Sequence, residues 1–317
     1  MNKFLPALLL SSVLFTGYAQ DSTLTYPYHF KSTGNPIIKH IRVADPSAHV
    51  WKDGQLWLYA SHDMDNATDY YSMDGYHVFS TKDMVNWTDW GEVLHSRDVK
   101  WGKAGTMWAP DCAYKNGKYY LYFPHKDHEG KWRTGVAVSK QPQGPFKPSD
   151  NYIEGTSGID PTCFIDDDGQ AYLYFNTNLV AKLKSNMTEL AEPARKITHD
   201  GQDSPGLEGT YMHKRKGIYY YSWSSPRTRP DQGFYATGTS PYGPFTNRQA
   251  MNAKPPGAQD HHSIVEFKGK NYYFYHIGNY NGGNSFRRNI SVDYLYYQED
   301  GAIQKVIQTK TGVAKVE

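Results

Sequence analysis

A short pattern of apolar and polar positions occurs five times along the chain. Its clearest copy is residues 158–174, GIDPTCFIDDDGQAYLY, in which a β-type run reaches an Asp-Gly pair and an aromatic-rich run follows. Asp-Gly between two such runs predicts a β-hairpin. An aromatic residue stands three positions after the turn glycine in every copy. The five turn glycines are Gly54, Gly117, Gly169, Gly217 and Gly269.

The spacing of the repeats predicts the fold. The turn glycines are 63, 52, 48 and 52 residues apart. Several short strands recurring at such a period are typical of a β-propeller with one blade per repeat. We therefore predict an all-β, five-bladed β-propeller, with four-stranded antiparallel blades around a central channel, as a single domain over residues 20–317. The expected blades are 45–105, 106–155, 156–204, 205–257 and 258–317. The lead-in, 20–44, is expected to hold a strand that closes the ring.

Residues 1–19 predict a signal peptide. Lys3 is followed by an apolar run from Leu5 to Phe15 and by small residues before Gln20. The apolar run is too short to span a bilayer, so we expect no membrane insertion. The expected destination is the periplasm or the outside of the cell. The alternative is a buried N-terminal strand.

Composition narrows the function classes. The net charge is +2 and Lys and Arg do not cluster, so nothing favours nucleic acid as a partner. We expect a monomer. Cys112 and Cys163 occupy similar repeat positions and could pair in an oxidising compartment. We expect two buried free thiols instead, and no cysteine metal site.

The repeat also predicts where the chemistry lies, because the first strand of each propeller blade lines the central channel. Like-charged carboxylates in a partly buried space push each other's pKa apart, which yields one proton donor and one base. Cleavage of a glycosidic bond needs that combination. The alternative is that each acid serves a turn, since Asp-Pro and Asp-Gly are common turn pairs. The residues that open the five copies are Asp45, Ala109, Asp160, Glu208 and His261.

Four motifs then resemble glycoside hydrolase family 43, five-bladed propellers that act on arabinose- and xylose-containing plant polysaccharides. They are ADPS (44–47), WAPD (108–111), GIDPTCFIDDDG (158–169) and LEGTY (207–211). The resemblance implies that Asp45 is the general base and Glu208 the general acid. It implies that Asp160 orients that acid and raises its pKa. It also implies inversion, for which carboxyl groups are roughly 6.5–9.5 Å apart.

The resemblance further implies a hydrated calcium ion at a histidine in the channel, within a Gly-His-x-Ser pattern. His261 matches that histidine, although Asp260 replaces the glycine. Ca²⁺ prefers oxygen ligands and would need water for most of its shell. The alternative is that His261 belongs to a hydrogen-bond network. His262 is the second candidate ligand, and we place it among the substrate-binding residues. No organic cofactor is expected.

An arginine from the fifth blade often reaches the active site in this family. Arg287 and Arg288 follow the Gly-rich segment 278–285, and Arg287 is the expected one. It would keep Asp160 ionised and contact a sugar hydroxyl. The alternative is a solvated surface arginine.

Aromatic residues near the motifs are candidates for stacking on sugar rings. Trp108 opens the WAPD motif of blade two and is the first candidate, ahead of Trp101 and Trp223, although such residues are more often core. The segment 123–125 (Phe-Pro-His) is expected to border the pocket.

We therefore expect an exo-acting, inverting hydrolase that releases terminal pentosyl units from plant poly- or oligosaccharides. The resemblance favours α-L-arabinofuranosyl over β-D-xylosyl units, because the chain ends soon after blade five, whereas the family's β-xylosidases often add a C-terminal β-sandwich. Alternatives are an endo-acting arabinanase or xylanase and an inactive carbohydrate-binding propeller.

Overall fold

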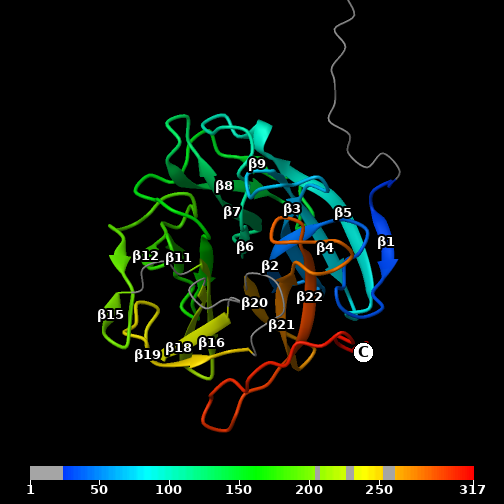
Figure 1. Ribbon diagram of the computed structural model, residues 1–317. Coiled ribbons are helices and arrows are strands. Elements are labelled where there is room, and N and C mark those ends of the chain that lie inside the picture. Colours follow the sequence, from blue (N-terminus) through cyan, green and yellow to red (C-terminus); the bar gives the residue numbers. More distant parts are fainter. Residues whose placement is uncertain (1–23, 204–207, 226–231, 253–260) are drawn as a thin grey trace, which may run out of the picture.

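Five antiparallel sheets follow one another around a central channel in chain order (Figure 1). The computed structural model describes residues 24–203, 208–225, 232–252 and 261–317, so the predicted signal peptide lies outside the described residues. Regular structure there is β-strand apart from one short 3₁₀ turn, η1 (Ser96–Asp98). No helix in these ranges is long and apolar enough to cross a membrane. The predicted five-bladed propeller is confirmed.

Blades one and two form the first two sheets. Blade one contains β1 (Tyr28–Lys31), β2 (Val43–Val50), β3 (Leu56–Asp63), β4 (Met73–Thr81) and β5 (Asn86–His95). Blade two contains β6 (Asp111–Lys115), β7 (Lys118–Lys126), β8 (Trp132–Ser139) and β9 (Lys147–Pro148). The inner strands β2 and β6 lie next to the channel (Figure 1).

The remaining blades complete the circuit. Blade three contains β10 (Thr162–Ile165), β11 (Ala171–Phe175), β12 (Leu179–Lys182) and β13 (Arg195–Lys196), and a two-stranded ribbon follows, β14 (Thr198–His199) and β15 (Gln202–Asp203). Blade four contains β16 (Glu208–Arg215), β17 (Ile218–Ser225), β18 (Gln232–Gly238) and β19 (Thr246–Ala250). Blade five contains β20 (His262–Phe267), β21 (Lys270–Ile277) and β22 (Asn289–Leu295).

The turn glycines form the inner hairpins as the repeat predicts. In blade two, Lys115 pairs with Lys118 across Asn116 and Gly117, whose φ angles are 52° and 79°. Two central residues with positive φ make a type I′ turn, which suits the twist of the strands and favours glycine. Blades four and five have the same two-residue turn at Gly217 and Gly269.

Apolar side chains fill the space between neighbouring blades. Successive residues of a strand face opposite sides of its sheet, so a middle strand contributes to two interfaces. In β17, Tyr219, Tyr221 and Trp223 pack towards blade three, whereas Tyr220 packs towards blade five. Each of the five interfaces holds one such cluster. Cys112 and Cys163 are buried in two of them and are free, as expected.

The closure of the ring differs from the expectation. The lead-in strand β1 pairs with β5 at the outer edge of blade one, giving that blade five strands and leaving blade five with three. The segment before β2 bonds to blade five without forming a strand: the N–H of Ile37 donates to the carbonyl of Ile290. The first residue of β2, Val43, donates its N–H to the carbonyl of Arg288. Pro36 in this segment has no N–H for a sheet ladder. Blades one and five therefore meet mainly through β2, which contacts β20, β21 and β22.

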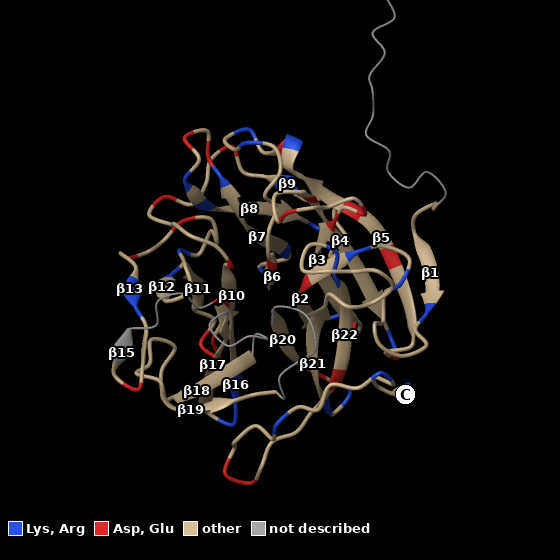
Figure 2. Cartoon of the chain, in the orientation of Figure 1, with Lys and Arg blue, Asp and Glu red and all other residues tan. Residues whose placement is uncertain are grey.

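Charged residues of both signs are interspersed around the ring (Figure 2). Asp45 lies near the start of β2, at one end of this channel-facing strand. This end of the channel holds the site described next.

Candidate active site

The five residues that open the repeats meet in one cavity. It encloses about 520 Å³ of space, including the part open to solvent. Each blade contributes its opening residue, which confirms that equivalent repeat positions converge on the channel. The residues that line the cavity are Asp45, Tyr70, Met73, Trp108, Ala109, Ile159, Asp160, Glu208, His261, His276 and Arg288.

Local backbone distortions place the acids. The pairing of β2 with β3 shifts register between Ala44 and Ser47, and that of β16 with β17 shifts between Glu208 and Tyr211. Such bulges free a residue from the ladder and re-aim its side chain. Asp45 and Asp160 also have φ of 54° and 55° although each precedes a proline, which normally favours extended backbone. Their conformations are strained and persist only because the surrounding structure fixes them.

A buried arginine holds Asp45 in place. Nη1 of Arg288 donates to Oδ1 of Asp45 at 3.0 Å. The same guanidinium donates through Nε and Nη2 to the two oxygens of Asp63, at 2.9 and 2.8 Å, and the backbone N–H of Arg288 donates to Asp63 at 2.8 Å. Asp63 is fully buried and Arg288 is 3% exposed. Bidentate pairing fixes a guanidinium in position, so Asp63 orients the group that contacts Asp45.

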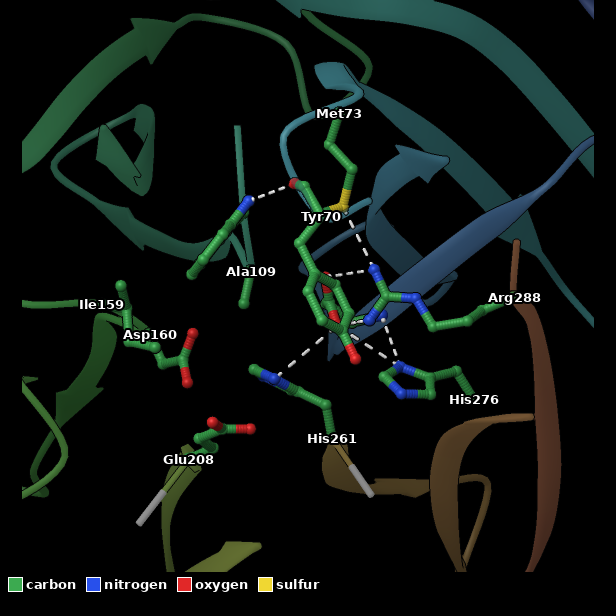
Figure 3. A pocket seen from close by; sticks show the side chains of 11 residues that line it. Tyr70, Met73, Ala109, Ile159, Asp160, Glu208, His261, His276 and Arg288 are labelled. Atoms are coloured by element: carbon green, nitrogen blue, oxygen red, sulfur yellow. Dashed lines mark hydrogen bonds and ion pairs between the residues drawn. The ribbon is translucent and has the colours of Figure 1, made fainter. Parts of the chain in front are cut away.

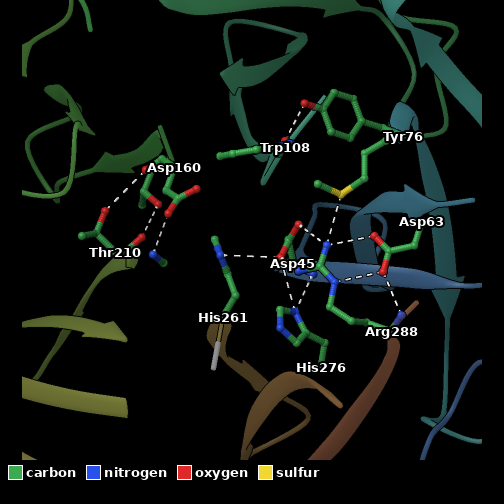
Figure 4. Close-up of polar contacts among 12 residues, drawn as sticks. Asp45, Asp63, Tyr76, Trp108, Asp160, Thr210, His261, His276 and Arg288 are labelled. Carbon is green, nitrogen blue, oxygen red and sulfur yellow. Dashed lines mark hydrogen bonds and ion pairs between the residues drawn. The ribbon is translucent and has the colours of Figure 1, made fainter. Parts of the chain in front are cut away.

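This contact keeps Asp45 ionised. Burial raises the pKa of the Asp45 carboxyl, but Arg288, His276 and His261 together lower it by more than burial raises it. The pKa of Asp45 therefore lies below its usual range. His276 is 3.3 Å and His261 3.8 Å from Oδ1 of Asp45 through their Nδ1 atoms (Figure 4). Nδ1 of His276 also lies 3.1 Å from the backbone nitrogen of Asp45, and burial lowers the pKa of His276. Burial also lowers the pKa of His261, to about 4.

The other side of the cavity holds two acids. Figure 3 shows Asp160 and Glu208 side by side, across from Arg288 and His276. Burial, followed by the negative charges of Glu208 and Asp45, raises the pKa of Asp160 to about 8, although the N–H of Gly209 donates to its Oδ2 at 2.8 Å and opposes the shift. The negative charge of Glu208 contributes to this shift, so ionisation of one of these two acids disfavours ionisation of the other.

The cavity therefore combines a carboxylate that is ionised at neutral pH with a carboxyl pair that retains a proton. General acid–base chemistry on a bond held between the two sides requires that combination. The roles of Asp45, Asp160 and Glu208 in catalysis stay predictions.

The arginine in the cavity is not the expected one. Arg287 does not line the cavity, and its Nη1 lies 3.5 Å from the carbonyl of Asp65 in the β3–β4 loop. Arg288 enters instead, because adjacent residues of an extended segment point in opposite directions. Its ion pairs are with Asp45 and Asp63, so it does not pair with Asp160 as expected of Arg287.

The two adjacent histidines separate in the same way. His261 lines the cavity, whereas His262 lies in the interface of blades four and five. His262 contacts Oγ of Ser222 at 2.9 Å through Nε2 and stacks on Tyr273. The structure therefore places it away from a substrate in this cavity.

Of the predicted aromatic candidates, only Trp108 lines the cavity. Its indole N–H donates to the carbonyl of Tyr70 at 2.7 Å, and its own carbonyl accepts from the hydroxyl of Tyr76 at 2.6 Å. Trp101 and Trp223 are core residues of the clusters between blades. The segment 123–125 does not border the cavity.

Several cavity residues were not predicted from sequence. Asp63, the last residue of β3, does not line the cavity but holds Arg288, which does. His276 lines the cavity and is the penultimate residue of β21, where an imidazole follows a run of aromatic residues. That break in pattern is a usable signal. Tyr70 comes from the polar insertion between β3 and β4. The insertion has no strand pattern, so the sequence does not indicate in which direction its side chains point.

The donor set fits a metal ion only loosely. Within the described ranges, no group of three or more His, Cys, Asp or Glu residues could hold an ion. A calcium ion at His261 would have one imidazole from the protein at that point and would keep most of its water.

Comparison with known proteins agrees with this geometry. The model of glycosyl hydrolases family 43 matches residues 33–303. The chain belongs to this family. It is therefore a glycoside hydrolase.

Relatives match over nearly their whole length. The chain is 39% identical to xylosidase/arabinosidase 43A of Humicola insolens, over 84% of this chain and 98% of that protein. It is 36% identical to a xylosidase/arabinosidase of Bacteroides ovatus, over 82% and 94%. A solved β-xylosidase/α-arabinofuranosidase from a compost microbial metagenome superposes with a TM-score of 0.81 at 37% identity, over 88% and 99%. That structure is a complex with xylotriose in a calcium-free form.

The shared proton predicts an alkaline limit on activity. The pKa of Asp160 is raised, so the pair holds its proton below about pH 8 and loses it as the pH rises. We expect kcat/KM to fall with an apparent pKa near 8. Asp160→Asn should move this limb to lower pH, because the substitution removes the negative charge that lies beside Glu208.

The measurement is the pH dependence of kcat/KM, with Asp150→Asn as a control at an exposed carboxylate. A limb that stays in place in Asp160→Asn would show that the two acids do not share the proton.

Proposed function

We propose that the protein is an exo-acting glycosidase that releases terminal pentosyl units, β-D-xylosyl and α-L-arabinofuranosyl, from plant cell-wall oligosaccharides. The observation that carries the proposal is the division of charge in one cavity. Asp45 is held ionised by Arg288, while Asp160 and Glu208 retain a proton across from it. Neither a turn nor a structural ion pair requires this arrangement.

In the proposed reaction, Asp45 takes a proton from a water molecule as that water attacks the anomeric carbon. Glu208 gives its proton to the leaving oxygen, and Asp160 positions Glu208 and maintains its proton. Attack from the side opposite the leaving group inverts the configuration. Arg288 lowers the proton affinity of Asp45, so the base is available at neutral pH.

Both sugars are proposed because similar proteins carry both names. The Humicola insolens and Bacteroides ovatus relatives are named xylosidase/arabinosidase, and the metagenome structure contains xylotriose. From the sequence alone, arabinofuranosyl is the first choice. The presence of both activities in single relatives favours one cavity that accepts either unit.

Turnover of aryl glycosides tests this function. We expect the protein to hydrolyse p-nitrophenyl β-D-xyloside and p-nitrophenyl α-L-arabinofuranoside, and to release single pentoses from xylotriose. The β-galactoside and intact arabinan serve as controls. Internal cleavage of arabinan or xylan would favour the endo-acting alternative. No hydrolysis of any of these substrates would favour a carbohydrate-binding propeller without activity.

The assigned acids predict the effects of substitution. We expect Glu208→Gln and Asp45→Asn each to lower kcat by at least about 100-fold, the lower end of what a positioned acid or base contributes. Unfolding midpoints should confirm that both variants fold. Proton NMR of the wild-type reaction on a β-xyloside should show α-xylose as the first product. Wild-type turnover in either variant, or β-xylose as the first product, would contradict the assignment.

We also propose that a largely hydrated calcium ion binds beside His261. The described residues fit it only as a water-coordinated ion, and when bound it would add positive charge to the channel. We expect calcium to raise the melting temperature of chelator-treated protein, and His261→Ala to abolish the shift. An equal shift in both proteins would place the ion elsewhere.

A further inference from the structure

An aromatic surface continues from the cavity wall to solvent. Trp108 lines the cavity, and its ring centroid lies 4.4 Å from that of Trp132 and 5.9 Å from that of Tyr71. Tyr71 is 55% exposed and Trp132 is partly exposed. We call Trp108, Trp132 and Tyr71 the aromatic strip.

The strip is built from separate parts of the chain. Tyr71 comes from the β3–β4 insertion of blade one, Trp132 begins β8 of blade two, and Trp108 precedes β6. The indole N–H of Trp108 donates to the carbonyl of Tyr70, which ties the strip to the insertion. The position of the rings therefore depends on contacts between two blades.

A lysine lies against the strip. Nζ of Lys126 is 4.5 Å from the ring centroid of Tyr71 and 5.1 Å from that of Trp132. Within the part of the chain that the structure describes, no ion pair joins this ammonium to a carboxylate. Cation–π contacts of this kind hold aromatic rings in place and leave N–H donors beside them.

Exposed aromatic rings with an adjacent donor suit a sugar chain. A pyranose presents apolar C–H groups on its faces and hydroxyls at its edge, so it can stack on a ring and accept from an ammonium. Xylopyranose, with its hydroxyls equatorial, has two such faces, whereas a puckered arabinofuranose has less flat surface to offer.

We propose that the aromatic strip binds the sugar units that follow the one being released, and that these units are xylopyranosyl. This inference rests on the proposed function, because it places the released unit in the cavity. The strip leads from the cavity wall outward, so the remainder of an oligosaccharide would pass over Trp132 and Tyr71. The enzyme would then distinguish a xylo-oligosaccharide from a single sugar with a small leaving group.

The test compares a long and a short substrate. We expect Trp132→Ala and Tyr71→Ala each to lower the ratio of kcat/KM on xylotriose to kcat/KM on p-nitrophenyl β-D-xyloside. The loss of one stacking ring should lower this ratio roughly 3- to 10-fold. Trp132→Phe should restore most of the ratio, since it keeps an aromatic face. A merely structural role for Trp132 would change both substrates together and leave the ratio unaltered.

Tyr296→Ala is the matched control. Tyr296 is a similarly exposed tyrosine, at 59%, but its ring lies against that of Tyr294 and it does not line the cavity. The ratio of the two kcat/KM values in Tyr296→Ala should equal that of the wild type. Unchanged ratios in both strip variants would overturn the proposal while leaving the proposed function intact. If the wild type hydrolyses neither substrate, the proposed function fails. The proposal for the aromatic strip is then tested separately, by calorimetric titration of xylotriose into the wild type and into Trp132→Ala. Weaker binding to the variant supports the proposal, and equal binding overturns it.

Discussion

The buried ion pairs of Arg288 connect the chemistry of this propeller to its closure. The guanidinium comes from blade five and lies between two carboxylates of blade one, Asp45 and Asp63. The backbone takes part as well, because the N–H of Arg288 donates to Asp63 and its carbonyl accepts from Val43. Removal of one partner from such a buried group costs about 3–5 kcal/mol, since the remaining charges have no water to solvate them. The joint between the first and last blades is therefore also the wall of the active site.

The same arrangement explains how similar side chains come to differ. Asp45 and Asp160 occupy one repeat position, precede prolines, share a left-handed backbone and are almost equally buried. Asp45 faces a cation and two imidazoles, whereas Asp160 faces another carboxylate. Their pKa values move in opposite directions for this reason. Burial alone would raise both, so neighbouring charges decide which acid can act as a base.

The sequence was informative wherever a property repeats. Hairpin turns at fixed spacing predicted five blades, and one position per repeat predicted the residues that meet in the cavity. What occurs once was harder to predict. Arg287 and Arg288 are adjacent in an extended segment, so their side chains point in opposite directions. The irregular loop before them does not indicate which of the two faces the channel. Asp63 precedes the insertion of blade one and Tyr70 lies within it, so neither occupies a position that the repeat shares. Among the described residues, blade five has three strands, and the lead-in segment bonds to it from more than 200 positions away, which no local pattern can reveal.

The central claim is that Arg288 and the paired acids divide one cavity into an ionised and a protonated side. The most direct measurement is a ¹³C NMR titration of the side-chain carboxyl groups, assigned with Asp45→Asn and Asp160→Asn variants. The account predicts that the Asp45 signal stays that of a carboxylate to the lowest pH at which the protein is folded. It also predicts that Asp160 and Glu208 together release one proton near pH 8. Titration of Asp45 near its ordinary value, with the other two acids fully ionised by pH 6, would contradict it.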